Sequence, residues 1–201
     1  MKTALLLSGG MDSLSLAWWK KPDVAITLDY GQIPAQAEIA AATAICKRLN
    51  ILHYVIQIDC RSLGSGDMAG ARADPLAPAS DWWPYRNQLL ITLTAMKAIA
   101  FGVTHLWIGT VKSDGSHKDG TPEFIDLMNR LMHFQEGEMI IEAPAISLST
   151  AELVKLSEVP SEYLAWAHSC HTSNVPCGEC RGCNKYFAVF EELGYDLDRS
   201  R

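Results

Sequence analysis

A pair of glycines flanked by hydroxyl and carboxylate side chains directly follows the first apolar run of the chain. The apolar residues 3–7 give way to Ser8-Gly9-Gly10-Met11-Asp12-Ser13, and a stretch typical of a helix comes next. A strand, a tight turn and a helix N-terminus form an anion site, because unpaired backbone N–H groups point outward and the helix dipole adds about half a positive charge. Ser8 and Ser13 can add hydroxyl donors, and Asp12 can hold Mg²⁺ against phosphate oxygens. The loop at residues 8–13 therefore predicts phosphate binding.

The spacing of this loop excludes two familiar nucleotide-binding motifs. No Gly-Lys-Ser/Thr follows the glycines, as a Walker A loop requires, and the G-x-G-x-x-G spacing is lacking. Two glycines alone would also fit an ordinary turn between a buried strand and a helix. The complete string is more specific and resembles the pyrophosphate loop of the N-type ATP pyrophosphatases, which activate a substrate by adenylation. The resemblance implies ATP and Mg²⁺ as cofactors.

Four cysteines near the C-terminus fall within fourteen residues: Cys170, Cys177, Cys180 and Cys183. Four thiolates at such spacing suit a structural, tetrahedral Zn²⁺ site. An iron–sulfur cluster is the alternative, because four cysteines also ligate one. His168 or His171 could replace a thiolate, although a place beside the ligands is favoured. We therefore expect a metal-binding helical tail at residues 166–201, after a nucleotide-binding domain at residues 1–165.

Composition is ordinary for a soluble globular protein. The 201 residues carry 17 Lys and Arg against 23 Asp and Glu, and this net charge of -6 makes a broad nucleic-acid-binding face unfavourable. The first apolar run is too short for a signal peptide, and no run approaches the ~18 residues that span a bilayer. A cytoplasmic location follows as the expectation, in which Cys46 and Cys60 would be buried, inert thiols.

Alternating apolar runs and helical stretches predict the scaffold. Residues 3–7, 24–28, 53–59 and 105–108 have the apolar character of buried strands, and helices are expected between them. Continuous apolar strands that alternate with helices indicate a doubly wound parallel sheet, covered on both faces. Ligands bind beyond the carboxyl ends of such strands, where the loop at residues 8–13 and Asp29-Tyr30-Gly31-Gln32 both lie.

Two polar loops flank the predicted helix at residues 88–101, which Asn87 could cap. The first, residues 61–86, ends in Trp82-Trp83-Pro84-Tyr85-Arg86, whose rings could stack on a flat heterocycle or could instead pin the loop to the core. The second, residues 110–121, follows a strand and is placed for substrate contact. Beyond it, a stripe of apolar residues at helical spacing is expected to be core: Phe124, Leu127, Met128 and Leu131. Ser149 and Glu152 form a capping-box pair before a further helix.

Taken together, these motifs resemble the QueC family over nearly the whole chain. That family converts 7-carboxy-7-deazaguanine to 7-cyano-7-deazaguanine with ATP and ammonia, in the queuosine pathway. The resemblance implies a homodimer and three sets of site residues. It places Asp29, Tyr30 and Gln32 near the nucleotide, together with the loop at residues 8–13. It places the substrate near Trp83, Tyr85, Arg86, Asn87, Asp114, Asp119 and Glu123. Catalytic roles are implied for Asp12, Ser13, Lys112 and Asp114.

The chain departs from the family pattern mainly around the expected substrate contacts. Ile33 and Pro34 stand where the family has a basic residue and a histidine, and residues 83–85 and 117–120 also differ. These departures keep two further hypotheses open. One is a defence-associated (antiviral) ligase that transfers a deazaguanine carboxylate to an amine of a protein partner. The other, weaker, is a non-catalytic binding or scaffold protein.

Overall fold

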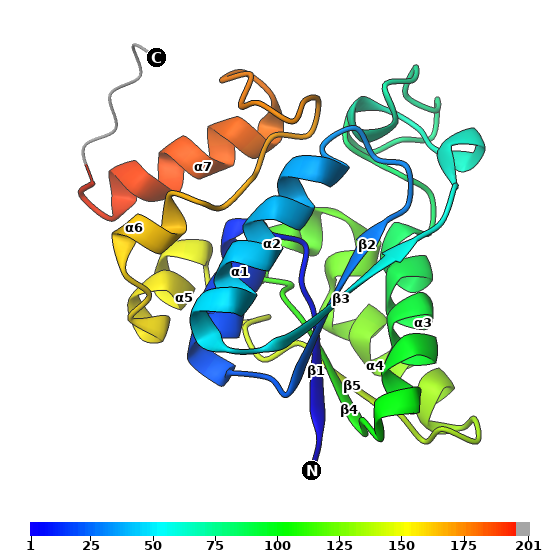
Figure 1. Ribbon diagram of the computed structural model, residues 1–201. Coiled ribbons are helices and arrows are strands. Elements are labelled where there is room, and N and C mark those ends of the chain that lie inside the picture. Colours follow the sequence, from blue (N-terminus) through cyan, green and yellow to red (C-terminus); the bar gives the residue numbers. More distant parts are fainter. Residues whose placement is uncertain (196–201) are drawn as a thin grey trace.

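The computed structural model describes residues 1–195, apart from the side chain of Ser116, and consists of one parallel sheet with helices on both faces (Figure 1). Five strands pair in the order β3-β2-β1-β4-β5, and every pairing is parallel. The strands are β1 (Thr3–Leu6), β2 (Val24–Asp29), β3 (Leu52–Gln57), β4 (His105–Ile108) and β5 (Ile140–Glu142). The predicted doubly wound α/β fold is confirmed.

Helices connect the strands and cover the sheet. They are α1 (Met11–Lys20), α2 (Ala35–Leu49), α3 (Arg86–Ala98), α4 (Pro122–His133), α5 (Thr150–Ser157), α6 (Ser161–Leu164) and α7 (Arg181–Glu192). Successive side chains of β1 enter opposite cores, because a strand directs alternate residues to its two faces. Ala4 joins the core beneath α3 and α4, whereas Leu5 joins the core shared by α1, α2, α5 and α7. No helix in residues 1–195 is long and apolar enough to cross a bilayer.

The tail is built into the second of these cores. Val189 and Phe190 of α7 are buried together with Leu14 of α1 and Val154 of α5. The predicted division of the chain near residue 166 therefore separates segments that share one apolar cluster. The last residues of the expected tail, 196–201, lie outside the described residues.

Some local expectations are confirmed and others need correction. The Ser149–Glu152 capping box is present at α5. Helix α3 begins at Arg86, with Tyr85 as its N-cap, so Asn87 is not the cap. Leu127 and Leu131 are 54% and 49% exposed, which contradicts their expected place in the core. The reason is that α4 packs at the edge of the sheet beside β5. Only the side of the helix that carries Ile125 and Met128 is buried there.

The turn after β1 brings the backbone of two elements together. Gly9 has a φ of +77°, and a Cβ at this position would collide with the carbonyl oxygen of Glu38 in α2. We expect Gly9→Ala to lower the free energy of unfolding by more than about 2 kcal/mol, because both the backbone conformation and the contact become unfavourable. Chemical denaturation measures this change. Gly115→Ala is the control, because nothing lies within 4 Å of the added Cβ; equal stability of the two variants would contradict the close approach at Gly9.

Candidate active site

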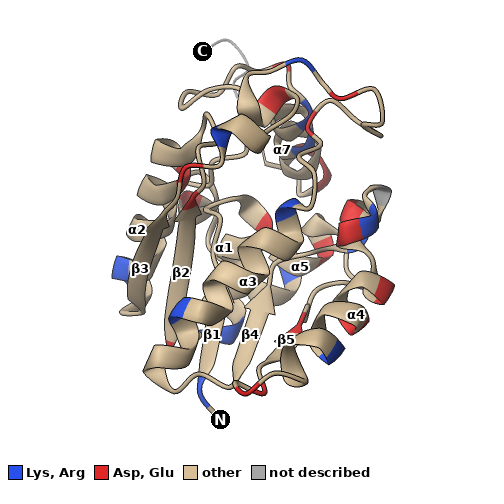
Figure 2. Cartoon of the chain, turned by 90° about the vertical axis from the view of Figure 1, so that its right-hand side faces the viewer, with Lys and Arg blue, Asp and Glu red and all other residues tan. Residues whose placement is uncertain are grey.

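A cavity of about 510 Å³ lies beyond the carboxyl ends of β1 and β4. Its walls come from the β1–α1 loop, the start of α3, the segment at residues 108–120 and the tail. Figure 2 shows the tail and α7 above these strand ends. β1 pairs with β2 on one side and β4 on the other, so successive crossovers run in opposite directions from it. Such a switch point is where open α/β sheets bind ligands.

The β1–α1 loop presents an open helix N-terminus to the cavity. Within residues 1–195, no side chain caps α1 at Gly10, so its first N–H groups remain available. The hydroxyls of Ser8 and Ser13 lie 3.1 Å apart, and Ser13 Oγ also donates to the Gly10 carbonyl at 3.1 Å. Gly109 lies directly against this turn, because a Cβ there would lie 2.9 Å from Ser13 Cα. The loop thus has the donors that the sequence predicts for phosphate oxygens.

A lysine from the tail lies between two carboxylates beside this loop. Lys185 Nζ donates to Asp12 Oδ2 at 2.8 Å and to Asp114 Oδ1 at 3.3 Å. Burial raises the pKa of Asp12, an effect that Lys185 opposes. Burial lowers the pKa of Lys185, but the two carboxylates raise it above its ordinary value on balance. Sequence reasoning missed Lys185, because nothing local in α7 signals a partner 173 residues away.

A further acidic residue of the cavity lining is Glu38 of α2, which lies near Tyr30 and Arg86. Glu38 accepts a hydrogen bond from Gln32 Nε2 at 2.8 Å, and burial raises its pKa to about 7. Nearby, burial raises the pKa of Tyr30 well above its ordinary value, despite the opposing effect of Arg86. Glu38 was not among the predicted site residues, since one acid in an Ala-rich helix resembles a solvated residue. Its position makes this part of the cavity able to accept N–H donors.

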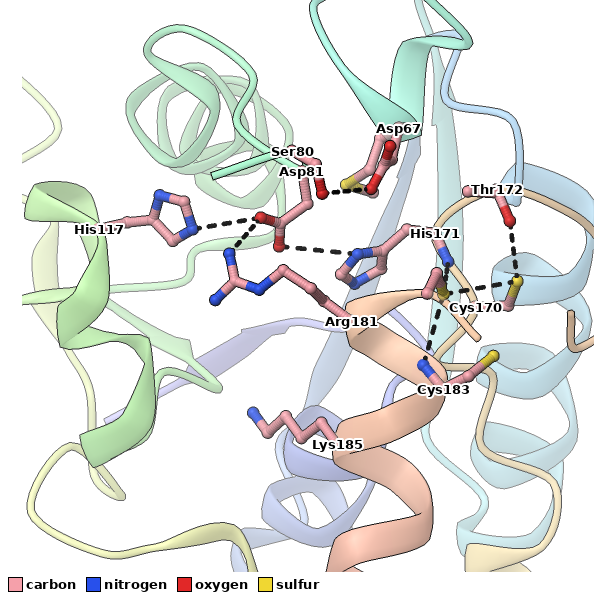
Figure 3. A network of polar contacts seen from close by, with 12 residues as sticks. Asp67, Ser80, Asp81, His117, Cys170, His171, Thr172, Arg181, Cys183 and Lys185 are labelled. Carbon is pink, nitrogen blue, oxygen red and sulfur yellow. Dashed lines mark hydrogen bonds and ion pairs between the residues drawn. The ribbon is translucent and has the colours of Figure 1, made fainter. Parts of the chain in front are cut away.

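Asp81 joins three walls of the cavity, as Figure 3 shows. Arg181 of α7 donates to its carboxylate at 2.6 Å, and the rings of His117 and His171 approach it to 3.5 and 3.6 Å. Burial would raise the pKa of Asp81, but these neighbours lower it on balance. One carboxylate therefore ties the loop at residues 61–86 to the loop after β4 and to the tail.

Most, but not all, of the predicted site residues reach the cavity. Those that line it are Ser8, Gly10, Met11, Asp12, Ser13, Tyr30, Arg86, Asn87, Asp114 and Asp119. Those that do not are Gly9, Asp29, Gln32, Trp83, Tyr85, Lys112 and Glu123. Trp83 is buried edge-on against Tyr30, so it pins its loop to the core, whereas Tyr85 is 78% exposed. Asn87 Nδ2 donates to the Asp119 carbonyl at 2.8 Å, which joins α3 to the second loop.

The four tail cysteines form a compact group of potential metal ligands. Their Sγ atoms all lie within 4.8 Å of one another. Cys180 also caps α7, because its Sγ accepts a hydrogen bond from the Cys183 N–H at 3.4 Å. The His168 ring instead contacts the Ser173 carbonyl and the His171 ring faces Asp81, so the cysteines alone make up this group. Four converging thiolates fit a tetrahedral metal ion.

Comparisons with solved structures agree with the parallel α/β fold. Two solved structures share the fold over nearly the whole chain, at identities too low to carry function. The U34-tRNA thiolase NcsA of Methanococcus maripaludis, solved with its [4Fe-4S] cluster, matches with a TM-score of 0.54 and 17% identity over 96% of this chain and 65% of its own. NMN synthetase of Francisella tularensis matches with a TM-score of 0.50 and 19% identity over 98% and 79%. At these identities the two structures support the parallel α/β fold alone.

Comparisons of the sequence with protein families identify the family of this chain. The model for "Queuosine biosynthesis protein QueC" matches residues 2–194. Proteins named 7-cyano-7-deazaguanine synthase from Methanospirillum hungatei JF-1 and Nostoc punctiforme are 31% and 32% identical, each over 96% of both chains. The chain belongs to the QueC family of enzymes.

The raised pKa of Glu38 predicts a pH-dependent stability. The folded protein holds this proton up to about pH 7, whereas the ordinary pKa is 4.5, so stability falls as pH rises through this window. The loss amounts to ~3 kcal/mol from ~1.4 kcal/mol per pKa unit. Glu38→Gln cannot lose a proton, so its stability relative to the parent should rise between pH 5 and pH 8 when measured by chemical denaturation. Glu136→Gln, at an exposed position, should show no such change; a parallel response of both variants would contradict the prediction.

The cysteine group predicts a bound metal ion. Elemental analysis of the purified protein should find about one ion per chain, because four thiolates fill a tetrahedral site. Cys180→Ser should lose most of it, since this thiol belongs to the group and also caps α7. Cys46→Ala, a buried cysteine elsewhere, should retain the metal. Full metal content in the Cys180 variant would show that the group is not the binding site.

Proposed function

We propose that this enzyme activates the carboxylate of 7-carboxy-7-deazaguanine with ATP and combines it with ammonia to form 7-cyano-7-deazaguanine. The relatives named for this product cover 96% of the chain, which supports the same reaction here. The observation that carries the proposal is one cavity with two chemically distinct walls. The β1–α1 loop suits phosphates, and the wall with Arg86, Asn87 and Asp119 suits a polar heterocycle.

The reaction needs activation because a carboxylate is a poor electrophile. Attack of its oxygen on the α-phosphorus of ATP releases pyrophosphate and gives an acyl adenylate. Ammonia then displaces AMP to give the amide, and a second ATP-dependent activation of the amide oxygen permits its elimination to the nitrile. The loop N–H groups and the Ser8 and Ser13 hydroxyls stabilise the charge that develops on the phosphates. Asp12 and Asp114 have the carboxylates to hold Mg²⁺, which would neutralise the leaving pyrophosphate when bound.

Substrate recognition is assigned to the opposite wall. Guanine-like bases present adjacent N–H donors, which carboxylates accept. Asp119, predicted for this role, lines the cavity, and both its backbone carbonyl and its Oδ2 accept hydrogen bonds from Asn87. Glu38 adds a second carboxyl group to the cavity lining. Unpaired acceptors in a site strongly disfavour a base that lacks the matching donors.

For the tail we propose zinc with a structural role. All four positions of a tetrahedral ion would be filled by Cys170, Cys177, Cys180 and Cys183, which leaves none for substrate. The [4Fe-4S] cluster of the NcsA structure makes iron the alternative to test. A colourless protein that contains zinc supports the proposal, and a red-brown protein that contains iron and sulfide contradicts it.

A protein amine is the second candidate acceptor in place of ammonia. It is favoured by residues 117–120, which depart from the family pattern and of which His117, Asp119 and Gly120 line the cavity. Such a ligase would end at the amide and would fit the defence-associated hypothesis. The homodimer and the cytoplasmic location stay predictions.

One assay separates these candidates. The purified protein is incubated with 7-carboxy-7-deazaguanine, Mg²⁺-ATP and ammonium, and the products are identified by mass. We expect the nitrile together with AMP and pyrophosphate. Asp12→Asn should reduce the rate by about 10²–10³-fold, because a charged group beside the phosphates is lost. Asp126→Asn, at an exposed position of α4, is the matched control and should keep the parent rate.

The remaining outcomes are equally decisive. AMP formation without nitrile, together with a deazaguanine adduct on a co-expressed protein by intact mass, would favour the protein acceptor. Absence of both AMP and product with the parent protein would contradict ATP activation and favour the non-catalytic hypothesis.

A further inference from the structure

The cavity holds more negative than positive side chains, although the proposed nucleotide is itself an anion. The acidic residues that line it are Asp12, Glu38, Asp81, Asp114 and Asp119, and the Lys and Arg residues are Arg86, Arg181 and Lys185. Lys112, the predicted catalytic lysine, is exposed and does not line the cavity. Lys185 is the one lysine among the described residues of the cavity wall, and it comes from the tail.

We propose that Lys185 is a binding residue for the phosphate groups of ATP, brought to the nucleotide site by the metal-binding tail. The proposal rests on ATP use, as proposed above. It assigns the tail a direct part in the phosphate site, in addition to the structural role of its metal.

The position of the Lys185 ammonium supports this assignment. Asp12, its partner at 2.8 Å, belongs to the first turn of α1 and precedes Ser13, whose hydroxyl lies 3.1 Å from that of Ser8. An ammonium has three N–H donors, and the described residues accept two of them, at Asp12 and Asp114. The side chain is 38% exposed and lines the cavity, so a phosphate on the β1–α1 loop would lie within its reach.

The carboxylates around Lys185 can bind a metal ion in place of the lysine. Asp12 Oδ1 is buried and has no hydrogen-bond partner among the described residues, which is unfavourable for a carboxylate and leaves it able to bind a cation. Mg²⁺ that arrives with ATP can satisfy both Asp12 and Asp114. The ammonium then needs a new anionic partner, and phosphate oxygens provide it.

The first turns of α7 fix the direction of this side chain. Cys180 caps the helix, and Arg181 is held by Asp81 at 2.6 Å. Gly182 lies so close to the backbone of Ser169 that a Cβ would collide with its carbonyl oxygen. Lys185 follows Cys183 by two residues, about half a turn of helix. The same cysteines that would hold the metal therefore orient the lysine.

Calorimetry tests the proposal without any deazaguanine. The two probes are inorganic pyrophosphate and a non-hydrolysable ATP analogue with a methylene bridge between the α- and β-phosphates, both with Mg²⁺. Lys185→Met should weaken both probes by about 10–100-fold, the range for one charge-assisted hydrogen bond in a protected site. Lys185→Arg keeps the charge and should recover part of the affinity. Lys47→Met, which removes an exposed lysine from α2, should bind like the parent.

Two further measurements exclude a merely structural role. Adenosine, which has no phosphate, should bind the parent and Lys185→Met equally, and the metal content of the two proteins should be the same. Parent-like affinity of Lys185→Met for the analogue and for pyrophosphate would overturn the proposal, and so would an equal loss of adenosine affinity. If the parent itself binds no analogue, the proposed function fails; if the parent binds and Lys185→Met binds equally well, only this inference fails.

Discussion

The pairing of a buried carboxylate near the start of the chain with an ammonium near its end governs the form of this site. Asp12 is held in place, because it lies in the first turn of a helix that packs against the sheet. A buried carboxylate without a cation would take up a proton, and it would then be a poor metal ligand. Lys185 opposes that change, which requires α7 to lie over the strand ends. This one contact therefore links the position of α7 to the charge of the β1–α1 loop.

The sheet makes this pairing possible by its order of strands. β1 is central, so its carboxyl end is bordered on one side by the β2 loop and on the other by the loop after β4. The two helical layers leave this edge open, and the tail closes it. Asp81 also holds the cavity together, because its contacts join three segments that are distant in sequence. Phosphate and heterocycle chemistry can therefore share one cavity although their residues come from separate loops.

Local features of the sequence were sufficient to predict the fold, the β1–α1 loop and the group of cysteines. An apolar run, two glycines and a helical stretch predicted the β1–α1 loop, because strand, turn and N-terminus are neighbours in the chain. The cysteine spacing predicted the thiolate group for the same reason. Leu127 and Leu131 were misplaced, because helical periodicity reveals an apolar face but not what covers it.

The residues that sequence reasoning missed depend on tertiary contact. Glu38 acquires its raised pKa only from the walls around it, and Lys185 acquires its role only from partners in other elements. Lys112 was predicted to be catalytic because of its loop, yet it is exposed and does not line the cavity. Charge type can be read from a sequence, but the environment that gives a charge its function cannot.

The distribution of the site along the chain has a consequence for biosynthesis. A ribosome makes the chain from its N-terminus, and domains fold progressively as they emerge. All five strands are complete by residue 142, whereas Arg181 and Lys185 come about forty residues later. A nascent chain can thus form the sheet and the open phosphate loop well before the tail is available to cover them. Because Cys183 precedes Lys185, the last cysteine of the thiolate group is synthesised just before the lysine, and both follow the complete sheet.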